Sequence, residues 1–265
     1  MNKIKRRYLI PALLLIAAAV GITVVNLYFS SADVLVYMYH SVREDPVNPE
    51  DADLSVRPEE FEKQLAFFAG DKRETIFASE LADIDKGGKY LLITFDDGYE
   101  DNYTEVYPLL KKYNCKATIF MITSLIDKEG YLSAEQIREM TESGLVSVQS
   151  HTVSHDPLAL GDKEYEDVDY EMRKSKLTLE AISGKAVDSV ALPNGSYDPV
   201  VLDIAGNYYD IIFSGTSLRP DNSDLLDVQR TGIYRHHSTW DVKAMTNYRG
   251  LYTLKRIVQK YIGPK

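Results

Sequence analysis

The chain has 265 residues, of which 45% are hydrophobic and 26% are charged, a balance typical of a folded globular protein. Its 40 acidic and 30 basic residues give a formal net charge of -10, which makes nucleic acid a poor partner. The single cysteine, Cys115, excludes an intrachain disulfide and a cysteine-based metal cluster.

The first thirty residues have the features of a membrane-targeting segment. Residues 8–29 are uncharged and mostly apolar, long enough to span a bilayer, and follow the basic residues Lys3, Lys5, Arg6 and Arg7. We therefore expect a cytoplasmic basic stub and transmembrane signal anchor over residues 1–31. We expect the protein to cross the cell membrane once and to carry an extracytoplasmic domain over residues 32–265. The alternative is a signal peptide cleaved near residues 30–32, which would release a secreted domain.

Beyond this segment, strands alternate with helices. Apolar, β-branched and aromatic runs predict strands, and N-cap residues mark several helix starts, such as Ser133 with Gln136 and Asp198 with Pro199. The predicted strands are 34–42, 90–95, 117–123, 145–149, 189–192, 210–214 and one near 232–236. The predicted helices are 58–69, 103–113, 134–144, 163–183, one starting at 199, and 251–261.

This alternation predicts an α/β fold in one domain. Near-continuous apolar strands separated by helices indicate a parallel sheet covered by helices, either open or closed as a barrel. Such folds place their chemistry at the carboxyl ends of the strands.

Two polar clusters follow predicted strands. Asp96 and Asp97 come directly after one strand, and His151 and His155 follow another. Positions i and i+4 share a face in a strand or a helix, so both imidazoles could reach one metal ion. The alternatives are a solvated Asp-Gly turn and a pair of surface histidines.

Together, two histidines and one carboxylate would form a three-ligand site with room for water and substrate. We expect a divalent metal there, with zinc favoured and Co, Ni, Mn and Fe as alternatives. The spare carboxylate could serve as general base, because a bound metal lowers the pKa of water to about 7.

At this point the sequence resembles a known family. TFDDGYEDN (94–102) and SHTVSH (150–155) are similar to the first two motifs of the polysaccharide deacetylases, the NodB homology group or carbohydrate esterase family 4. The resemblance implies a NodB-like, deformed (β/α) barrel of about seven strands, with a homology core over about 89–265. It also implies removal of N-acetyl groups from a sugar polymer. By position, Asp96 would be the general base, and Asp97, His151 and His155 the metal ligands.

The third motif of the family resembles ALPNG (191–195) but departs from it. Ala191 stands where many members have an arginine, and Asn194 where an aromatic residue is common. In the family that arginine orients the general base, so the resemblance does not say what would orient Asp96 in this chain.

The segments VLVYMYHSV, PEEFEKQL and ITFDDGYEDNY resemble the branch that de-N-acetylates poly-β-1,6-N-acetylglucosamine in biofilm matrix. In that branch the barrel is circularly permuted, and the strand bearing the acid histidine comes first. The resemblance implies that His40 is the general acid, with His236 and His237 as rivals. The expected substrate is an extracellular N-acetylglucosamine polysaccharide, with poly-β-1,6-N-acetylglucosamine favoured.

Further residues are candidates for contact with the substrate. The loop of Pro193, Asn194 and Gly195 could offer a backbone N–H to the oxyanion. Aromatic faces suit pyranose rings, so the tyrosines and the single tryptophan invite a role in sugar binding, although most tyrosines pack in cores. The aromatic candidates are Tyr99, Tyr103, Tyr197 and Trp240.

Rival functions share parts of this pattern. One is an N-deacetylase of peptidoglycan or a chitin-like oligosaccharide. Another, of a different class, is a carbohydrate-binding surface protein with reduced catalysis, which Ala191 makes plausible. A metal phosphoesterase is disfavoured because no lysine or arginine cluster accompanies the motifs. The sequence indicates no particular protein partner.

Overall fold

The structure is a computed structural model that describes Gly21 and residues 34–46, 49–85, 88–158, 165–195, 197–216 and 224–247. The chain divides into two compact units. One is Asp33–Thr239, and the other combines Met1–Ala32 with Trp240–Lys265. The predicted domain over residues 32–265 therefore extends beyond the first unit, and the predicted boundary at residue 31 lies outside the described residues.

Within the described part of the chain, no helix is both long enough and apolar enough to cross a membrane. The predicted span over residues 8–29 lies outside the described residues, apart from Gly21. The signal anchor therefore stays a prediction.

Seven parallel strands close into a ring. Each strand pairs with its neighbour in chain order, and the ring closes because the first strand pairs with both the second and the last. The ring strands are β1 (Val34–Tyr39), β5 (Tyr90–Phe95), β6 (Ala117–Met121), β7 (Val146–Ser150), β8 (Ser189–Ala191), β9 (Ile211–Thr216) and β10 (Val228–Gly232). This arrangement confirms the predicted α/β barrel of about seven strands.

Three shorter strands complete the sheets. β4 (Glu74–Ile76) pairs with the first half of β5, while β6 pairs with its second half, so the barrel is deformed at the amino ends of these strands. β2 (Ser41–Val42) and β3 (Ser55–Val56) form a separate parallel pair just after β1.

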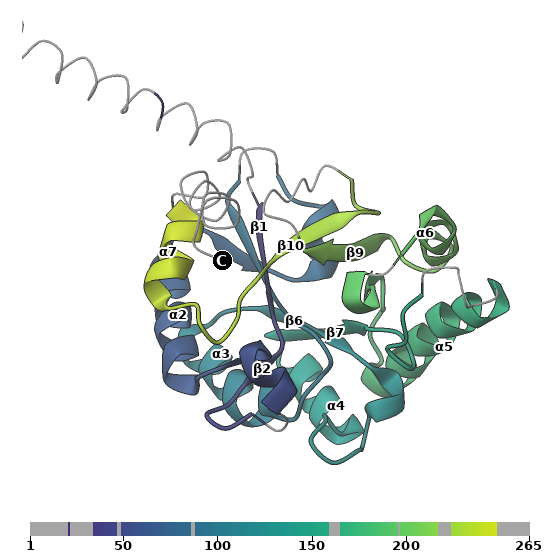
Figure 1. Ribbon diagram of the computed structural model, residues 1–265, viewed down its shortest axis with the longest axis horizontal. Helices are drawn as coiled ribbons and strands as arrows, with labels where there is room; N and C mark the ends of the chain where they lie inside the picture. The colour runs from purple at the N-terminus through teal and green to yellow at the C-terminus, as the bar shows by residue number, and fades with distance from the viewer. Residues whose placement is uncertain are drawn as a thin grey trace, which may run out of the picture. The chain divides into compact units, whose positions relative to one another are not determined.

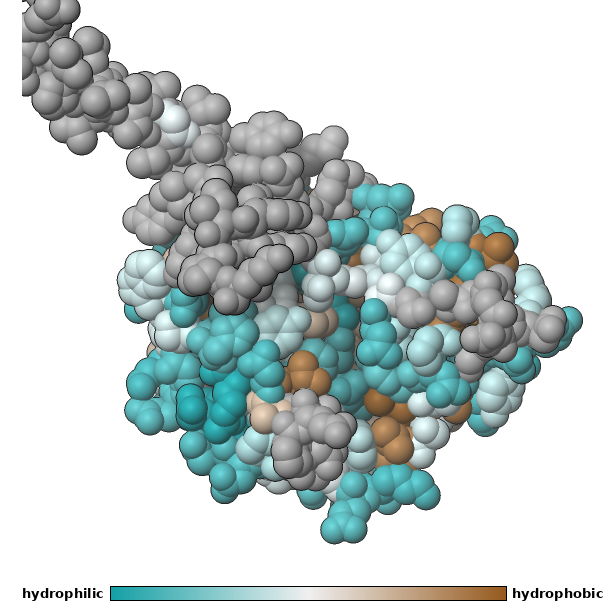
Figure 2. All heavy atoms as spheres, in the orientation of Figure 1, coloured by the Kyte–Doolittle hydropathy of each residue, from teal (hydrophilic) through white to brown (hydrophobic). Residues whose placement is uncertain are grey.

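Helices surround the ring of strands (Figure 1). The helices of the barrel unit are α2 (Pro58–Gly70), α3 (Tyr107–Tyr113), α4 (Ala134–Glu142), α5 (Tyr165–Ser183) and α6 (Pro199–Gly206). Short helical turns are η1 (Pro49–Leu54), η2 (Ala78–Ala82), the π-helix η3 (Asn102–Val106), η4 (Thr123–Leu125) and η5 (Pro193–Gly195). Figure 2 shows mostly hydrophilic side chains on the described surface of this face, as expected for an outer helical layer.

The barrel interior is apolar at one end and polar at the other. Alternate residues of a strand point the same way, so Val34 and Val36 of β1 join a buried cluster with Leu92 of β5 and Phe213 of β9. Ile76, from β4, packs into the same cluster. Further along the strands, the same alternation brings polar residues inward, and these form the site described below.

Several predicted elements differ from the structure in detail. The last barrel strand is Val228–Gly232 and overlaps the predicted segment 232–236 only at Gly232. The predicted helix 103–113 begins as the π-helix η3. Helix α7 (Thr239–Asn247) was not predicted, and the predicted helix 251–261 lies outside the described residues. The predicted capping box of Ser133 with Gln136 and the Asp198 N-cap are both confirmed.

Candidate active site

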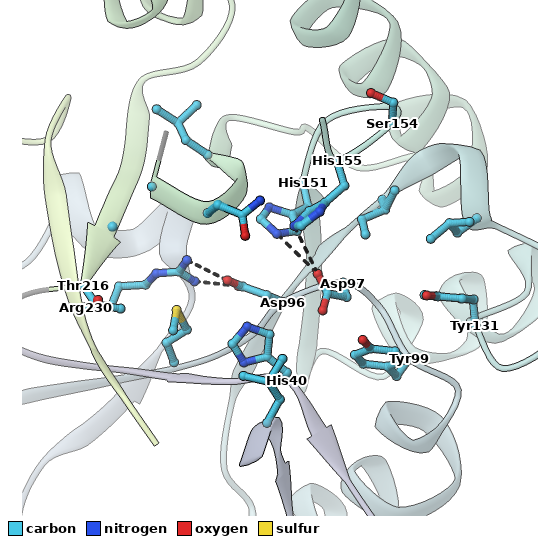
Figure 3. A pocket seen from close by; sticks show the side chains of 18 of the residues that line it. His40, Asp96, Asp97, Tyr99, Tyr131, His151, Ser154, His155, Thr216 and Arg230 are labelled. Atoms are coloured by element: carbon cyan, nitrogen blue, oxygen red, sulfur yellow. Dashed lines mark hydrogen bonds and ion pairs between the residues drawn. The ribbon is translucent and has the colours of Figure 1, made fainter. Parts of the chain in front are cut away.

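A cavity of about 560 Å³ opens at the carboxyl ends of the barrel strands. Its polar lining comes from separate strands: His40 follows β1, Asp96 and Asp97 follow β5, and His151 follows β7. Figure 3 shows these side chains converging, with the two aspartates in the middle. The predicted catalytic and metal-binding residues thus share one cavity.

Asp97, His151 and His155 form a candidate metal site. One ligand atom from each lies within 4.8 Å of the others. The Nε2 atoms of His151 and His155 lie 3.5 and 3.6 Å from Asp97 Oδ1. His151 Nδ1 lies 2.7 Å from the carbonyl oxygen of Ala191, so a proton on Nδ1 leaves Nε2 free to bind a cation. Two imidazole nitrogens and one carboxylate oxygen fit a catalytic divalent ion.

Charge and burial act in opposite directions on these groups. Burial alone would raise the pKa of Asp97, but the hydrogen bond and charge of His151 hold it well below its ordinary value. Burial alone would lower the pKa of His151, but the Asp96 and Asp97 carboxylates raise it. Burial, followed by the charge of His151, lowers the pKa of His155. Asp97 is thus held as a carboxylate, the form that binds a cation.

Asp96 is paired with a buried arginine. Arg230 Nη1 and Nη2 donate to the two carboxylate oxygens of Asp96 at 2.6 and 2.7 Å. Burial alone would raise the pKa of Asp96, but the Arg230 guanidinium, with charge from His151, holds it below its ordinary value. The bidentate pair fixes the carboxylate in one orientation and keeps it ionised.

Arg230 is a functional residue that the sequence reasoning missed. It lies on β10, is 2% exposed, and has its guanidinium 5.4 Å from the Phe120 ring centre and 5.7 Å from that of Phe213. It orients Asp96 by its charge, the role for which the sequence offered no arginine at position 191. The available signal was a lone arginine in the strand-like run VQRTG, where a charge must have a partner if the strand is buried.

Ala191 contributes through its backbone. Its side chain is fully buried in the apolar cluster, and its carbonyl oxygen is the atom that contacts His151. An arginine side chain at position 191 is therefore not needed to orient Asp96, which Arg230 does, or to hold His151, which the Ala191 carbonyl does.

His40 faces the aspartates from the opposite side to His151 and His155 (Figure 3). Its Nδ1 is buried and has no hydrogen-bond partner among the described residues. The chain at and directly after His40 is held by two contacts: Asn102 Nδ2 donates to His40 O at 3.0 Å, and Ser41 Oγ donates to Asp101 at 2.6 Å. The segment that follows β5 therefore contains the two aspartates and also restrains the loop of His40.

The rival histidines lie elsewhere. His236 is exposed, contacts Asp53 at 2.9 Å, and together with His237 lines a separate cavity. Among the histidines proposed as the acid, the structure places only His40 in the cavity with Asp96.

The loop of Pro193, Asn194 and Gly195 lies at the edge of the site, and Asn194 and Gly195 line the cavity. Both residues adopt left-handed backbone, with φ of 55° and 61°. Asparagine tolerates this conformation better than an aromatic residue does, which accounts for Asn194. Proline has no N–H, and the Gly195 N–H donates to Leu192 O, so the remaining N–H of the three belongs to Asn194.

The aromatic candidates separate clearly. Tyr99 lines the cavity and stacks on Tyr131 with ring centres 5.3 Å apart. Tyr103 and Tyr197 instead donate to Glu139 and Asp227. Tyr131 and Tyr234 also line the cavity and were missed, because nothing local in the sequence distinguishes them from other tyrosines. Trp240 belongs to the other compact unit, so its role stays a prediction.

Comparison with known proteins agrees with this geometry. The family model described as polysaccharide deacetylase matches residues 83–208. A crystal structure of a polysaccharide deacetylase from Bacillus cereus superposes with a TM-score of 0.72 at 30% identity, over 80% of this chain and 68% of that one. The chain therefore belongs to the polysaccharide deacetylase family.

Two curated relatives are similar over part of their length. YxkH of Bacillus subtilis, provisionally named a polysaccharide deacetylase, is 34% identical over 64% of this chain and 60% of its own. The poly-β-1,6-N-acetyl-D-glucosamine N-deacetylase of Staphylococcus epidermidis is 31% identical over 52% of this chain and 54% of its own. The chain thus spans less than two thirds of the length of either relative.

Proposed function

We propose that this protein is a metal-dependent hydrolase that removes N-acetyl groups from an extracellular N-acetylglucosamine polysaccharide. One observation carries the proposal. A single cavity brings together a buried Asp96–Arg230 pair, the candidate metal ligands Asp97, His151 and His155, and His40 on the opposite side of the aspartates. These are the groups that hydrolysis of an amide requires: a base, an electrophile site and an acid.

Asp96 is suited to act as the general base. A divalent ion held by Asp97, His151 and His155 would polarise the acetamide carbonyl and lower the pKa of a water molecule. Asp96 accepts the proton of the attacking water. Each of its oxygens retains a lone pair beyond the one engaged by Arg230, and the guanidinium keeps it deprotonated between turnovers.

His40 is suited to act as the general acid. Attack on the carbonyl carbon produces a tetrahedral oxyanion, to which the Asn194 N–H can donate. Collapse of this species releases the sugar nitrogen, which needs a proton to leave as an amine. His40 lies across the aspartates from His151 and His155, and in this proposal it donates the proton.

Poly-β-1,6-N-acetylglucosamine is the favoured substrate. The Staphylococcus epidermidis relative is named for this polymer, and the segments around His40 and Asp96 resemble that branch. The basic residues and apolar run of the first thirty residues support an extracytoplasmic location, where such a polymer is found.

A carbohydrate-binding protein without turnover is the rival from another class. It rested on Ala191, the position where many family members have the arginine. Arg230 contacts Asp96 directly, so the missing arginine no longer argues for lost catalysis.

The test is acetate release by the full chain in detergent. Substrates are a β-1,6-linked N-acetylglucosamine oligomer, a β-1,4-linked chitin oligomer and peptidoglycan fragments, each with added Zn²⁺ and with chelator. Asp96→Asn keeps the size of the side chain but removes its basicity, and loss of a general base costs about 10²–10⁴-fold in rate. We expect Zn²⁺-dependent release from the β-1,6 oligomer that this variant lacks.

Other outcomes have definite meanings. Release only from peptidoglycan or chitin fragments would move the substrate to the cell wall or to a chitin-like polymer. Bound metal with no acetate release from any of the three would contradict the proposal and support the binding-protein alternative.

A further inference from the structure

Glu171 is a buried carboxylate that touches none of the proposed reacting groups. It lies on α5, in the outer helical layer, and is 7% exposed. Its Oε2 accepts hydrogen bonds from the backbone N–H groups of Val153 and Ser154 at 2.7 and 2.9 Å, and its Oε1 accepts one from Ser154 Oγ at 2.9 Å. All three donors belong to the turn between the two metal-site histidines.

This turn has an unfavourable backbone conformation. Thr152 and His155 are left-handed, with φ of 66° and 65°, although neither is glycine. Such residues cost on the order of 1–3 kcal/mol each and persist only where the surroundings fix them. The Glu171 carboxylate accepts hydrogen bonds from the backbone N–H groups of two consecutive residues between them, Val153 and Ser154, so it stabilises the turn where local preference does not.

The two histidines depend on this turn to different degrees. His151 is held at its ring, because Nδ1 contacts the Ala191 carbonyl, and its side chain is 3% exposed. The ring of His155 is 30% exposed, and within the described residues its only polar contact is with Asp97 at 3.6 Å. Its ring also packs edge-on against that of His151, with ring centres 4.8 Å apart. No hydrogen bond within the described residues anchors this ring as the Ala191 carbonyl anchors that of His151, so its position depends more on the backbone that carries it. That backbone begins at Ser154, whose N–H and hydroxyl both donate to Glu171.

We propose that Glu171 is a positioning residue of the metal site. From α5 it holds the turn 152–155 so that His155 presents its imidazole to the ion shared with Asp97 and His151. The inference rests on the proposed metal site, but it concerns a residue outside the family motifs and outside the cavity lining.

Zinc affinity of the full chain tests the proposal without any substrate. Titration against a competing chromogenic chelator compares wild type with Glu171→Gln, which keeps the size of the side chain but turns an NH₂ group toward N–H donors. Loss of a residue that orients a metal ligand weakens metal binding about 10–100-fold, and we expect a fall of that size. Glu166→Gln, an exposed position on the same helix with the same change of charge, should bind zinc like wild type.

A double-mutant cycle separates positioning from a general loss of structure or charge. His155→Ala alone removes a ligand. If Glu171 acts through His155, adding Glu171→Gln to His155→Ala should lower zinc affinity by less than about twofold. A full additional loss in that background would overturn the proposal, because it would show that Glu171 acts by charge or by stabilising the fold.

Ser154→Ala covers the case in which Glu171→Gln does not fold. It removes one of the three bonds from an exposed side chain and should weaken zinc binding about 2–5-fold, consistent with one lost hydrogen bond. Unchanged zinc affinity in Ser154→Ala, or in a folded Glu171→Gln, would overturn the inference. Failure of the wild type to bind zinc would instead count against the proposed metal site.

Discussion

Arg230 is a buried charge whose counter-charge is the Asp96 carboxylate. A buried guanidinium is costly without a counter-charge, and here both of its terminal nitrogens are used by Asp96, with Nη1 also 3.2 Å from Thr94 Oγ1. Two aromatic rings flank it. Asp96 therefore compensates the buried guanidinium, and the guanidinium in turn sets the protonation of the proposed base.

Replacing Arg230 should shift the pH dependence of acetate release. In Arg230→Met, the guanidinium charge that opposes the effect of burial on Asp96 is gone, so the pKa of Asp96 rises. As the pH falls, activity is therefore lost at a higher pH than in wild type. We also expect kcat to fall about 100-fold, since the carboxylate is no longer oriented. The measurement is the pH profile of kcat/KM. Arg230→Lys, which keeps the charge, should shift the acid limb less, and an unmoved limb in Arg230→Met would refute this role.

Cys115 should react slowly in the folded protein. Burial raises the pKa of its thiol to about 11, so only about one molecule in a thousand carries the thiolate at pH 8. Alkylation by iodoacetamide at pH 8 should be slow in native protein, accelerate as the pH approaches 11, and become fast in urea. Equal rates at pH 8 in native and unfolded protein would contradict the burial of this thiol.

Among the elements, the turn after β5 is the most constrained. Asp97 and Gly98 are both left-handed, with φ of 72° and 77°, and the position of a Cβ on Gly98 would lie 2.0 Å from Met121 Sδ. The glycine thus allows the strand to end in two adjacent carboxylates while β6 packs directly beside the turn.

Gly98→Ala should destabilise the protein more than Gly130→Ala. Both glycines have positive φ, 77° and 82°, so each alanine costs about 1–2 kcal/mol from backbone strain. Only Gly98 faces a close neighbour, and overpacking adds about 1–3 kcal/mol. Urea unfolding of the two variants measures the difference. Equal free energies of unfolding would show that Met121 moves aside without cost.

The elements that the sequence predicts well are those whose signals are local. Asp96 and Asp97 follow the apolar strand β5, His151 and His155 follow β7, and the structure brings all four into one cavity. β10 contains polar residues at most positions and was placed too late in the chain. The role of Arg230 depends on Phe120, Phe213 and Asp96, which are far from it in sequence, so no local pattern could reveal it.

For the whole molecule, the barrel is closed by backbone hydrogen bonds rather than by a metal. The candidate ligands extend from strand ends that pair in the ring, and no disulfide is available. The metal site is therefore an addition to a complete fold.

Chelation should abolish acetate release without unfolding the protein. We expect an unchanged far-UV circular dichroism spectrum and a lower Tm, because an ion present at 100 times its Kd stabilises the native state by about 2.7 kcal/mol. Readdition of Zn²⁺ should restore both activity and Tm. Loss of the circular dichroism signal on chelation would show that the fold itself depends on the ion.

Closure of the ring also has a consequence for the order in which the molecule forms. β1 pairs with β10, Tyr37 opposite Thr231, and Asp96 meets Arg230 across 134 positions of sequence. Contacts between such distant segments slow the folding of a domain. A chain still lacking its last strand holds every candidate metal ligand, yet exposes an open edge on β1 and leaves Asp96 without its counter-charge. We therefore expect Asp96 to be oriented as a base only when the final strand is in place, so chains truncated before β10 should release acetate far more slowly than the complete chain.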